Sequence, residues 1–386
     1  ESVHPAIKGV QGAQSSGAAL VSFNAPAFCS YGREQNLNAP VGKYAAFAYT
    51  TALNHLLSDR KHVKRIGDTT VVYWAEDAES RYQDAFTCIL DGSADENTVT
   101  NKDLDDFMSA ISRGQPANWD GIPLKPDNRF FVLGLAPNAA RLSVRFFLRD
   151  NFGSFVRNLK RHYSDIEIVR DNRGWPGRIP LWALLRETVN EKSSDKTPSP
   201  QMSGDTLRAI LSGGRYPATL YQYTQLRIRA EKRISQGRAA IIKAYLHRNT
   251  DKKEYKEALT VELNDKTTYQ PYVLGRLFSV AEAIQEAASD VTTIKDKYFS
   301  SACANPALVF PIVIDLMEKH LKKLEGPARI YFEKQVGELM GKITQSYPTH
   351  HNLYEQGVFQ IGYYHQTQKR FEKKDKTGIV QKEAAN

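Results

Sequence analysis

The chain has 386 residues, 41% of them hydrophobic and 25% charged, so it can form two or three domains with buried cores. Its 52 lysines and arginines exceed its 43 aspartates and glutamates, and the resulting net charge of +9 indicates an acidic partner such as nucleic acid. Three scattered cysteines exclude a disulfide framework, and no apolar run reaches the roughly 18–20 residues of a membrane span. We therefore expect a cytoplasmic protein with no membrane partner.

The first feature along the chain is a loop rich in glycine, glutamine and serine, with the sequence GVQGAQSSGAALVSFN at residues 9–24. It is not a P-loop, because two alanines follow Gly17 where a lysine and a hydroxyl residue are required. The glycine spacing also differs from that of a dinucleotide-binding turn. Two interpretations stay open: a loop that contacts phosphates or base edges, and an ordinary surface turn.

Residues 1–190 mix helix and strand signals, which predicts an α+β domain. The expected elements, in chain order, are a helix at 41–58, strands at 69–75, 130–135 and 141–148, and a helix followed by a short strand at 150–168. Between them, residues 84–106 carry seven acids and one lysine, a patch expected to face solvent or a basic protein.

The strand at 141–148 carries arginines at alternate positions. Regular alternation would place Arg141, Ser143 and Arg145 on one face of the sheet, opposite the apolar side chains between them. This predicts a basic stripe. A nucleic-acid surface and a solvated sheet face are both compatible with it.

A polar segment at 191–204, rich in serine, proline and charged residues, predicts a linker. Residues 205–264 follow as a basic helical segment, in which 227–256 hold ten lysines and arginines against three acids. A run of charges is commonly a solvated helix face, but this one has a single sign and favours contact with phosphates. Tyr221 and Tyr223, just upstream, are candidate stacking partners for bases.

The remaining residues, 265–386, are expected to form a four-helix bundle. Helix starts and stops are indicated by Pro271, Asn305-Pro306, Gly326-Pro327 and Pro348. The predicted fold class is thus α+β, with a mixed N-terminal part followed by an all-helical part that ends in the bundle.

We find no catalytic or metal-binding motif. The nine histidines form no His-Glu-x-x-His pair, and there is no Gly-x-Ser-x-Gly turn. The one Ser-x-x-Lys sequence, at 193–196, lies in the polar linker, where no cavity would position it. We expect no catalytic residues, no metal and no cofactor. An enzyme whose site is assembled from residues distant in the sequence stays open as an alternative.

Four long irregular blocks carry a resemblance to a known family. They are HPAIKGVQGAQSSGAALVSFNAPAFCSYGREQNLNAPV at 4–41, RFFVLGLAPNAARLSVRFF at 129–147, YVLGRLFSVAEAIQEAA at 272–288 and FQIGYYHQTQKRF at 359–371. In this order they resemble the large subunit of the type I-C CRISPR surveillance complex, the Csd-type Cascade protein. The family's subunit is longer, so we expect its N-terminal domain to be missing ahead of Glu1, together with most residues that read the protospacer-adjacent motif (PAM).

The resemblance implies a non-catalytic, DNA-binding subunit of a crRNA-containing complex with backbone and handle-binding subunits. It would check the PAM in target double-stranded DNA, help to open the duplex, hold the displaced strand and present the R-loop to a nuclease-helicase effector. The C-terminal bundle would resemble the small subunits of such complexes.

Side chains able to donate to phosphates or bases are the candidate DNA contacts. They are Lys8, Gln14, Ser15, Ser16, Asn24, Arg33, Arg141, Arg145, Arg227, Arg229, Lys232, Arg233 and Arg238. Two alternatives stay open. Gln14 and Ser15 would instead satisfy buried carbonyls within the fold, or the whole chain would be a scaffold that docks neighbouring subunits without touching DNA.

Overall fold

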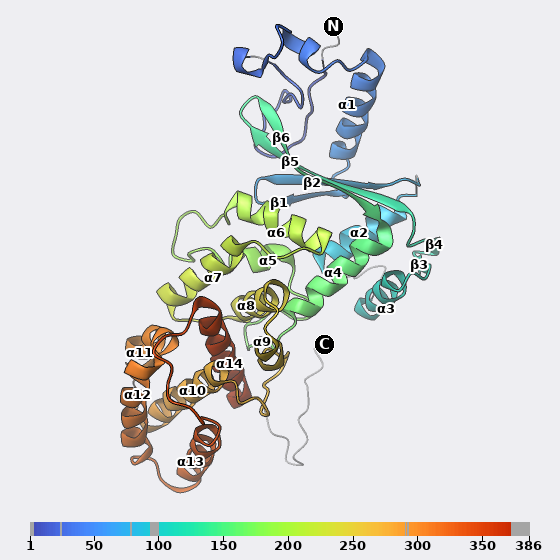
Figure 1. Ribbon diagram of the computed structural model, residues 1–386. Helices are drawn as coiled ribbons and strands as arrows, with labels where there is room; N and C mark the ends of the chain where they lie inside the picture. Colours follow the sequence, from blue (N-terminus) through green and yellow to red (C-terminus); the bar gives the residue numbers. More distant parts are fainter. Residues whose placement is uncertain are drawn as a thin grey trace. The chain divides into compact units, whose positions relative to one another are not determined.

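The computed structural model describes residues 4–23, 25–77, 79–92, 100–289, 291 and 293–371 (Figure 1). The strands lie in the N-terminal part of the chain and most helices in the C-terminal part, which confirms the predicted α+β class. The chain forms two compact units. Unit 1 comprises Glu1–His162, Pro180–Leu185 and Asp195–Pro217, and unit 2 comprises Tyr163–Ile179, Arg186–Ser194 and Ala218–Asn386.

Unit 1 is built on a four-stranded antiparallel sheet of strand order β1-β2-β5-β6. These strands are β1 (Val63–Ile66), β2 (Thr69–Ala75), β5 (Arg129–Asn138) and β6 (Arg141–Asn151), and a separate hairpin pairs β3 (Ala117–Trp119) with β4 (Ile122–Leu124). Three of the four predicted strands are confirmed, as β2, β5 and β6. The strands β1, β3 and β4 were not predicted, because their three or four residues are too few to show an alternating pattern.

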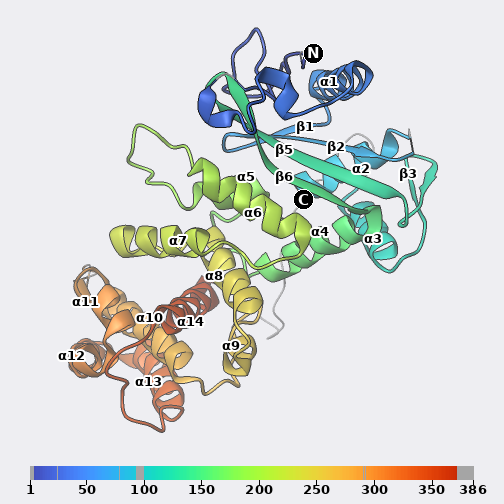
Figure 2. The same cartoon turned by 45° about the horizontal axis from the view of Figure 1, so that its top comes forward.

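The two faces of the sheet are covered by different elements, as Figures 1 and 2 show. We call them the α1 face and the α4 face. On the α1 face, Val72, Leu135 and Leu142 pack with Leu53 and Leu57 from α1 (Lys43–Ser58) and with the N-terminal loop, which contributes Ile7, Val10 and Ala18. The predicted helix at 41–58 is thus confirmed, and it covers one side of the sheet.

The α4 face carries an aromatic core. The ring of Phe130 lies 4.9 Å from that of Phe86 in α2 (Arg81–Asp91) and 5.4 Å from that of Phe152, the first residue of α4 (Phe152–Ile166). The helix α3 (Asn101–Ser112) begins with a capping box between Thr100 and Asp103. The short strand expected near 168 is not formed, since Val169 donates only one backbone hydrogen bond there, to the carbonyl of Val261.

The segment predicted as a linker contains the start of a helix. The helix α6 (Pro200–Ser212) begins inside 191–204 and contacts β1, β2 and β6 of unit 1. Small side chains make this packing possible, because a Cβ on Gly67 would lie 2.9 Å from the Cβ of Ser203. The compact units therefore do not divide at residue 190, and the polar composition that predicted a linker belongs in part to a helix lying on the sheet.

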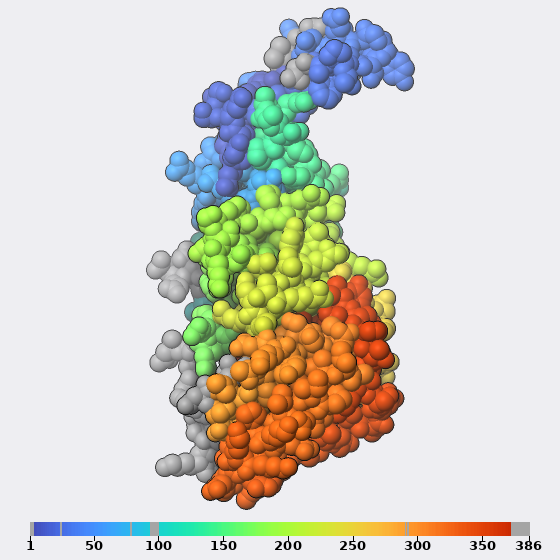
Figure 3. Space-filling model, turned by 90° about the vertical axis from the view of Figure 1, so that its left-hand side faces the viewer, coloured from blue at the N-terminus to red at the C-terminus, as the bar shows by residue number. Residues whose placement is uncertain are grey.

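Unit 2 is helical. Its elements are α7 (Ala218–Glu231), α8 (Gln236–Asn249), α9 (Lys253–Ala258), α10 (Gln270–Ala288), α11 (Thr293–Ala304), α12 (Pro306–Leu321), α13 (Gly326–Met340) and α14 (Leu353–Phe371). The short α5 (Leu181–Arg186) belongs to unit 1 except for its last residue. The central pair is α10 and α14, most of whose residues are buried. In Figure 3 the orange residues of α11 to α13 form a continuous outer surface.

The described residues after 265 contain five helices, not the four expected for the bundle. The expected first helix is divided into α10 and α11, although residues 289–292 include no proline or glycine, the residues that indicated the other breaks. The side chain of Gln285 links the end of α10 to the start of α11. It donates to Thr293 Oγ1 over 2.9 Å and accepts from the Ile294 backbone over 2.8 Å.

The central helices α10 and α14 touch through their backbones. A Cβ placed on Gly275 would lie 1.9 Å from the carbonyl oxygen of Phe359, and one on Gly362 would lie 2.1 Å from that of Tyr272. Buried polar pairs flank this crossing, among them Tyr272 Oη and His365 Nδ1 at 2.8 Å. Burial lowers the pKa of His365 to about 3, so its ring is neutral.

The close contact of α10 and α14 at Gly275 predicts that a glycine-to-alanine substitution there and one in α13 change the free energy of unfolding in opposite directions. Gly275→Ala is expected to lower the free energy of unfolding by about 1–3 kcal/mol or more, because the added methyl meets backbone that cannot rotate away. Gly337→Ala, in exposed α13 with no atom near its Cβ position, is expected to raise it by about 0.5–1 kcal/mol. Thermal and urea unfolding followed by circular dichroism measure both. Equal effects of the two substitutions would contradict the proposed backbone contact.

Candidate nucleic-acid interface

The N-terminal loop is closed by a two-residue bridge. Ile7 and Ala18 exchange both backbone hydrogen bonds, each 2.9 Å long, and their side chains enter the core of the α1 face. Gly17 has a φ of +107°, and a Cβ there would lie 2.8 Å from that of Ala6, so only glycine fits without strain. The loop is therefore anchored at its base.

Further contacts hold the loop to the sheet and to α1. The backbone of Lys8 donates to Asn54 Oδ1 over 2.8 Å, and that of Gln11 donates to Thr70 Oγ1 over 3.0 Å. The tip is exposed, including the side chains of Gln14, Ser15 and Ser16. Within the described part of the chain none of these three side chains has a hydrogen-bond partner, so Gln14 and Ser15 do not satisfy buried carbonyls.

Arg141 lies next to the base of this loop. The backbone of Ala19 pairs with the β5–β6 turn, donating to Ala140 over 3.2 Å and accepting from Leu142 over 2.9 Å. The guanidinium carbon of Arg141 sits 4.3 Å from the centroid of the Phe28 ring, a cation–π contact that orients it. The fold thus brings together two candidate sites that are far apart in the sequence.

Two other predicted residues belong to this end of the chain. Arg33 is exposed between the short 3-10 helices η1 (Pro26–Phe28) and η2 (Gln35–Asn38), where its backbone donates to the carbonyl of Ser30 over 3.0 Å. Asn24 lies outside the described residues.

The predicted basic stripe on β6 is not formed, because a β-bulge interrupts the alternation. Gly134 pairs with Phe146 and Leu135 with Val144, which leaves Arg145 without a partner in β5. The extra residue shifts the pattern by one, so Phe146 continues the face of Arg141. Arg145 instead pairs with Asp68 in the β1–β2 turn, with 2.7 Å between Nη2 and Oδ2.

Arg238 is a further correction, since its side chain is only 2% exposed. Its Nη2 donates to Glu231 Oε2 over 2.5 Å, and its Nε lies 3.4 Å from Glu187 Oε2. Burial raises the pKa of Glu187, opposed by hydrogen bonding to Ser235 and by the charge of Arg238. A buried and paired guanidinium cannot reach a phosphate, so Arg238 is a structural residue.

Several other cations of the basic run also have partners within unit 2. Arg248 is buried against Asp165, and Lys243 donates to the carbonyls of Ser164 and Asp165. The remaining four candidates lie nearer the surface. Arg227 pairs with Glu231, and Arg233 lies 3.8 Å from Glu191. Arg229 donates to the side chain of Gln356, and Lys232 donates to the carbonyl of Asp296. Arg229 and Arg233 stay exposed. Tyr221, considered for stacking on bases, is buried against Tyr245.

These contacts predict that Arg238 and Arg233 contribute differently to stability. Arg238→Ala is expected to destabilise the protein by about 3–5 kcal/mol, because it removes the buried guanidinium that pairs with both Glu187 and Glu231. Arg233→Ala, which removes a long, solvated pair, should cost less than about 1 kcal/mol. Urea unfolding of both variants tests this. If the Arg238→Ala protein were fully stable but bound DNA more weakly, Arg238 would contact DNA and would not be a structural residue.

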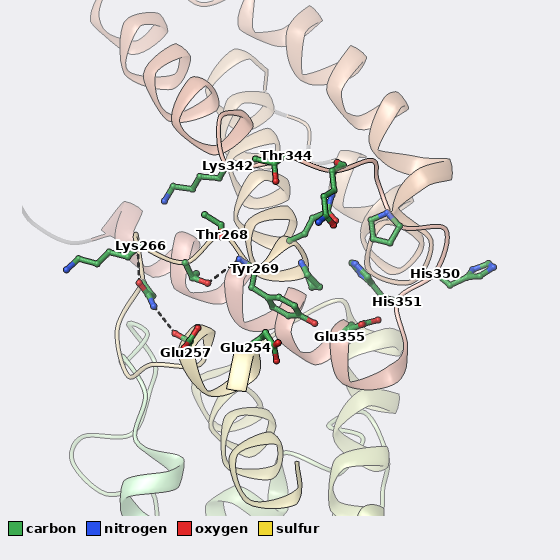
Figure 4. A pocket seen from close by; sticks show the side chains of 16 residues that line it. Glu254, Glu257, Lys266, Thr268, Tyr269, Lys342, Thr344, His350, His351 and Glu355 are labelled. Carbon is green, nitrogen blue, oxygen red and sulfur yellow. Dashed lines mark hydrogen bonds between the residues drawn. The ribbon is translucent and has the colours of Figure 1, made fainter. Parts of the chain in front are cut away.

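Unit 2 also contains an open cleft of about 780 Å³ between the α9–α10 and α13–α14 connections (Figure 4). Its lining mixes Glu254, Glu257 and Glu355 with Lys266 and Lys342, and Figure 4 shows no common point on which these side chains converge. Among the described residues, no group of three or more His, Cys, Asp or Glu side chains could hold a metal.

None of the described helices has the length and apolar character that crossing a membrane requires.

Comparison with known proteins identifies the family of this chain. None of the curated proteins matches it. The family model described as CRISPR-associated protein (Cas_Csd1) matches residues 1–371, which include all four blocks that carry the resemblance. Because this match covers nearly the whole chain, the protein belongs to the Cas_Csd1 family, the large-subunit family of type I-C Cascade.

Proposed function

We propose that this Cascade subunit binds DNA without catalysing a reaction. It would contact the duplex on the PAM side, support strand separation and R-loop stabilisation, and help to recruit the nuclease-helicase. Since guide pairing reads the target sequence in such complexes, the protein's task is to hold the backbone and a few bases. That task needs anchored donors on the surface and no active site.

The observation that carries the proposal is the anchored loop beside Arg141. Its exposed tip offers the amide of Gln14 and the hydroxyls of Ser15 and Ser16, and Lys8 and Arg141 lie at or near its base. Neutral donors of this kind position a backbone or contact base edges, while the nearby cations neutralise phosphates. Because the base of the loop is held by backbone bonds, little of its freedom would be lost on binding.

Removing the neutral donors tests the loop. The double substitution Gln14→Ala and Ser15→Ala is expected to weaken binding of the assembled complex to duplex target DNA by about 1–3 kcal/mol, the net contribution of two hydrogen bonds. Fluorescence anisotropy with a labelled duplex measures this, and size-exclusion chromatography checks that the complex still assembles.

The matched control is Gln115→Ala with Ser212→Ala, two exposed residues of the same types elsewhere in unit 1. The control should bind like the unmodified protein. If the loop variant also does so, the loop is an ordinary surface turn.

The exposed cations of α7 and its C-terminal end make a second contact of the proposal. Reversing Arg229 and Arg233 to Glu is expected to lower affinity for all DNA sequences alike and to reduce the slope of log K against log salt by about 2, as expected for two lost phosphate contacts. Lys319→Glu with Arg329→Glu makes the same change of charge on the exposed faces of α12 and α13 and is the control. Equal slopes for the two variants would remove Arg229 and Arg233 from the interface.

A scaffold without DNA contact is the second candidate, and one observation favours it. Apolar side chains are exposed on α12 and α13, with Leu308 73% and Ile330 68% accessible and Ile312 and Tyr331 close to half accessible. Such side chains are typical of surfaces that dock another protein. The acidic patch at 84–106 belongs to the same hypothesis, although residues 93–99 lie outside the described part of the chain. A scaffold would bind DNA with a shallow dependence on salt in the isolated chain, and a DNA-binding subunit with a steep one.

A further inference from the structure

Three aromatic rings from neighbouring strands lie together on the α1 face of the sheet. Trp74 of β2 and Phe131 of β5 are 5.3 Å apart with 13° between their planes, and Phe147 of β6 is 6.3 Å from Phe131 at 11°. Trp74 and Phe147 are 6.2 Å apart at 24°. The three rings are therefore nearly parallel and mutually adjacent.

The strand register explains this cluster. Trp74 is directly opposite Phe131, and Phe147 is opposite Leu133, two residues further along β5. Directly paired residues share a face, and diagonal neighbours are within reach of aromatic side chains. The bulge at Arg145 sets this register, because without the extra residue Phe147 would project from the other face.

The covering of the α1 face ends at these rings. The hydrophobic cluster formed by α1 and the N-terminal loop reaches Leu133 and Trp74, but Phe147 remains 54% exposed. In Figures 1 and 2 the strands β2 and β5 continue past α1 at this end. A single exposed phenylalanine needs no explanation, but parallel rings on three strands at an uncovered sheet face form a continuous apolar surface.

Arginines border the rings. Arg149 is directly opposite Phe131, is exposed, and has no ion pair with any described residue. Arg129 is two residues before Phe131 in β5 and therefore on the same face, and its Nη1 lies 3.5 Å from Glu76 Oε1. The border therefore holds two cations against one anion, and Arg149, which has no acidic partner, is the one directly opposite Phe131.

We infer that this surface, Trp74, Phe131 and Phe147 with Arg149, binds unpaired nucleotides of a single-stranded nucleic acid. A base would stack against the exposed ring of Phe147, and Arg149 would neutralise the adjoining phosphate. Paired bases in a duplex cannot offer their faces in this way, so the surface selects strands that are already separated. The inference goes beyond the proposed loop contact with duplex DNA, and it rests on different residues.

A nucleic acid suits this surface better than a protein partner does. Parallel rings beside a cation without a partner match the repeating alternation of base and phosphate along one strand. Open four-stranded sheets that bind single strands use aromatic rings on adjacent strands in the same manner. Packing within the sheet accounts for the contact between Trp74 and Phe131, but it leaves more than half of Phe147 unused.

The test uses the full chain and a fluorescein-labelled oligothymidylate of about 12 nucleotides, within the range that single-strand sites cover. Phe147→Ala is expected to weaken binding about 10-fold, as for the loss of one base stack, and Phe147→Tyr should restore it. Phe47→Ala, at a phenylalanine of α1 that is 62% exposed, is the matched control and should bind normally. Thermal unfolding of each variant confirms that it is folded.

Two further measurements separate the outcomes. Oligonucleotides with 5-iododeoxyuridine should crosslink to Trp74 or Phe147 on irradiation, and mass spectrometry maps the crosslinked residue. In the second measurement, Arg149→Ala should reduce the slope of log K against log salt by about 0.7, as for one lost phosphate contact with a single strand. The exposed control Arg113→Ala should leave the slope unchanged. Unchanged binding by Phe147→Ala, crosslinks confined to other residues, or a loss of complex assembly in place of oligonucleotide affinity would each overturn the inference. Failure of the loop variant with duplex target would leave these results untouched, because its probe and its residues are different.

Discussion

The arrangement of unit 1 follows from the need to cover a sheet with two apolar faces. The α4 face is closed by an aromatic core on which α2 and α4 pack, and α6 also contacts the sheet. The α1 face is closed by one helix and an irregular loop, and the loop has to fold back on itself to bring Ile7, Val10 and Ala18 into the core. Burial of those apolar side chains holds the base of the loop, so its polar tip is left at the surface in a defined place.

Incomplete covering of the same face has a second result. The hydrophobic cluster extends as far as Trp74 and Leu133, and beyond it the rings of Phe131 and Phe147 meet solvent beside Arg149. The two surfaces that we connect with nucleic acid are thus products of one packing problem. Where α1 and the loop cover the sheet, a donor-rich tip results, and where they do not, an aromatic surface remains.

Unit 2 shows how far charge along a sequence can differ from charge in space. Its basic run meets acids and carbonyls from segments distant in sequence, including Asp165, Glu187 and Glu191. Cations buried in this way hold helices together, because leaving either partner alone in a low-dielectric interior costs several kcal/mol, of the order of 3–5. Arg229 and Arg233, at the margin of this network, and the lysines at 252, 253 and 256 remain exposed enough for an outside partner.

The sequence alone determined the fold class, three strands of the main sheet, the helix at 41–58 and the family, because period-two and helical patterns and long irregular blocks are local signals. It also indicated the polar loop at its correct place. It could not indicate that Arg238 is buried, that a bulge turns Arg145 away from Arg141, or that Trp74, Phe131 and Phe147 form one surface. These features were decided by the tertiary structure. Each depends on strand register or on a partner many residues away, and neither of these produces a periodic pattern in the sequence.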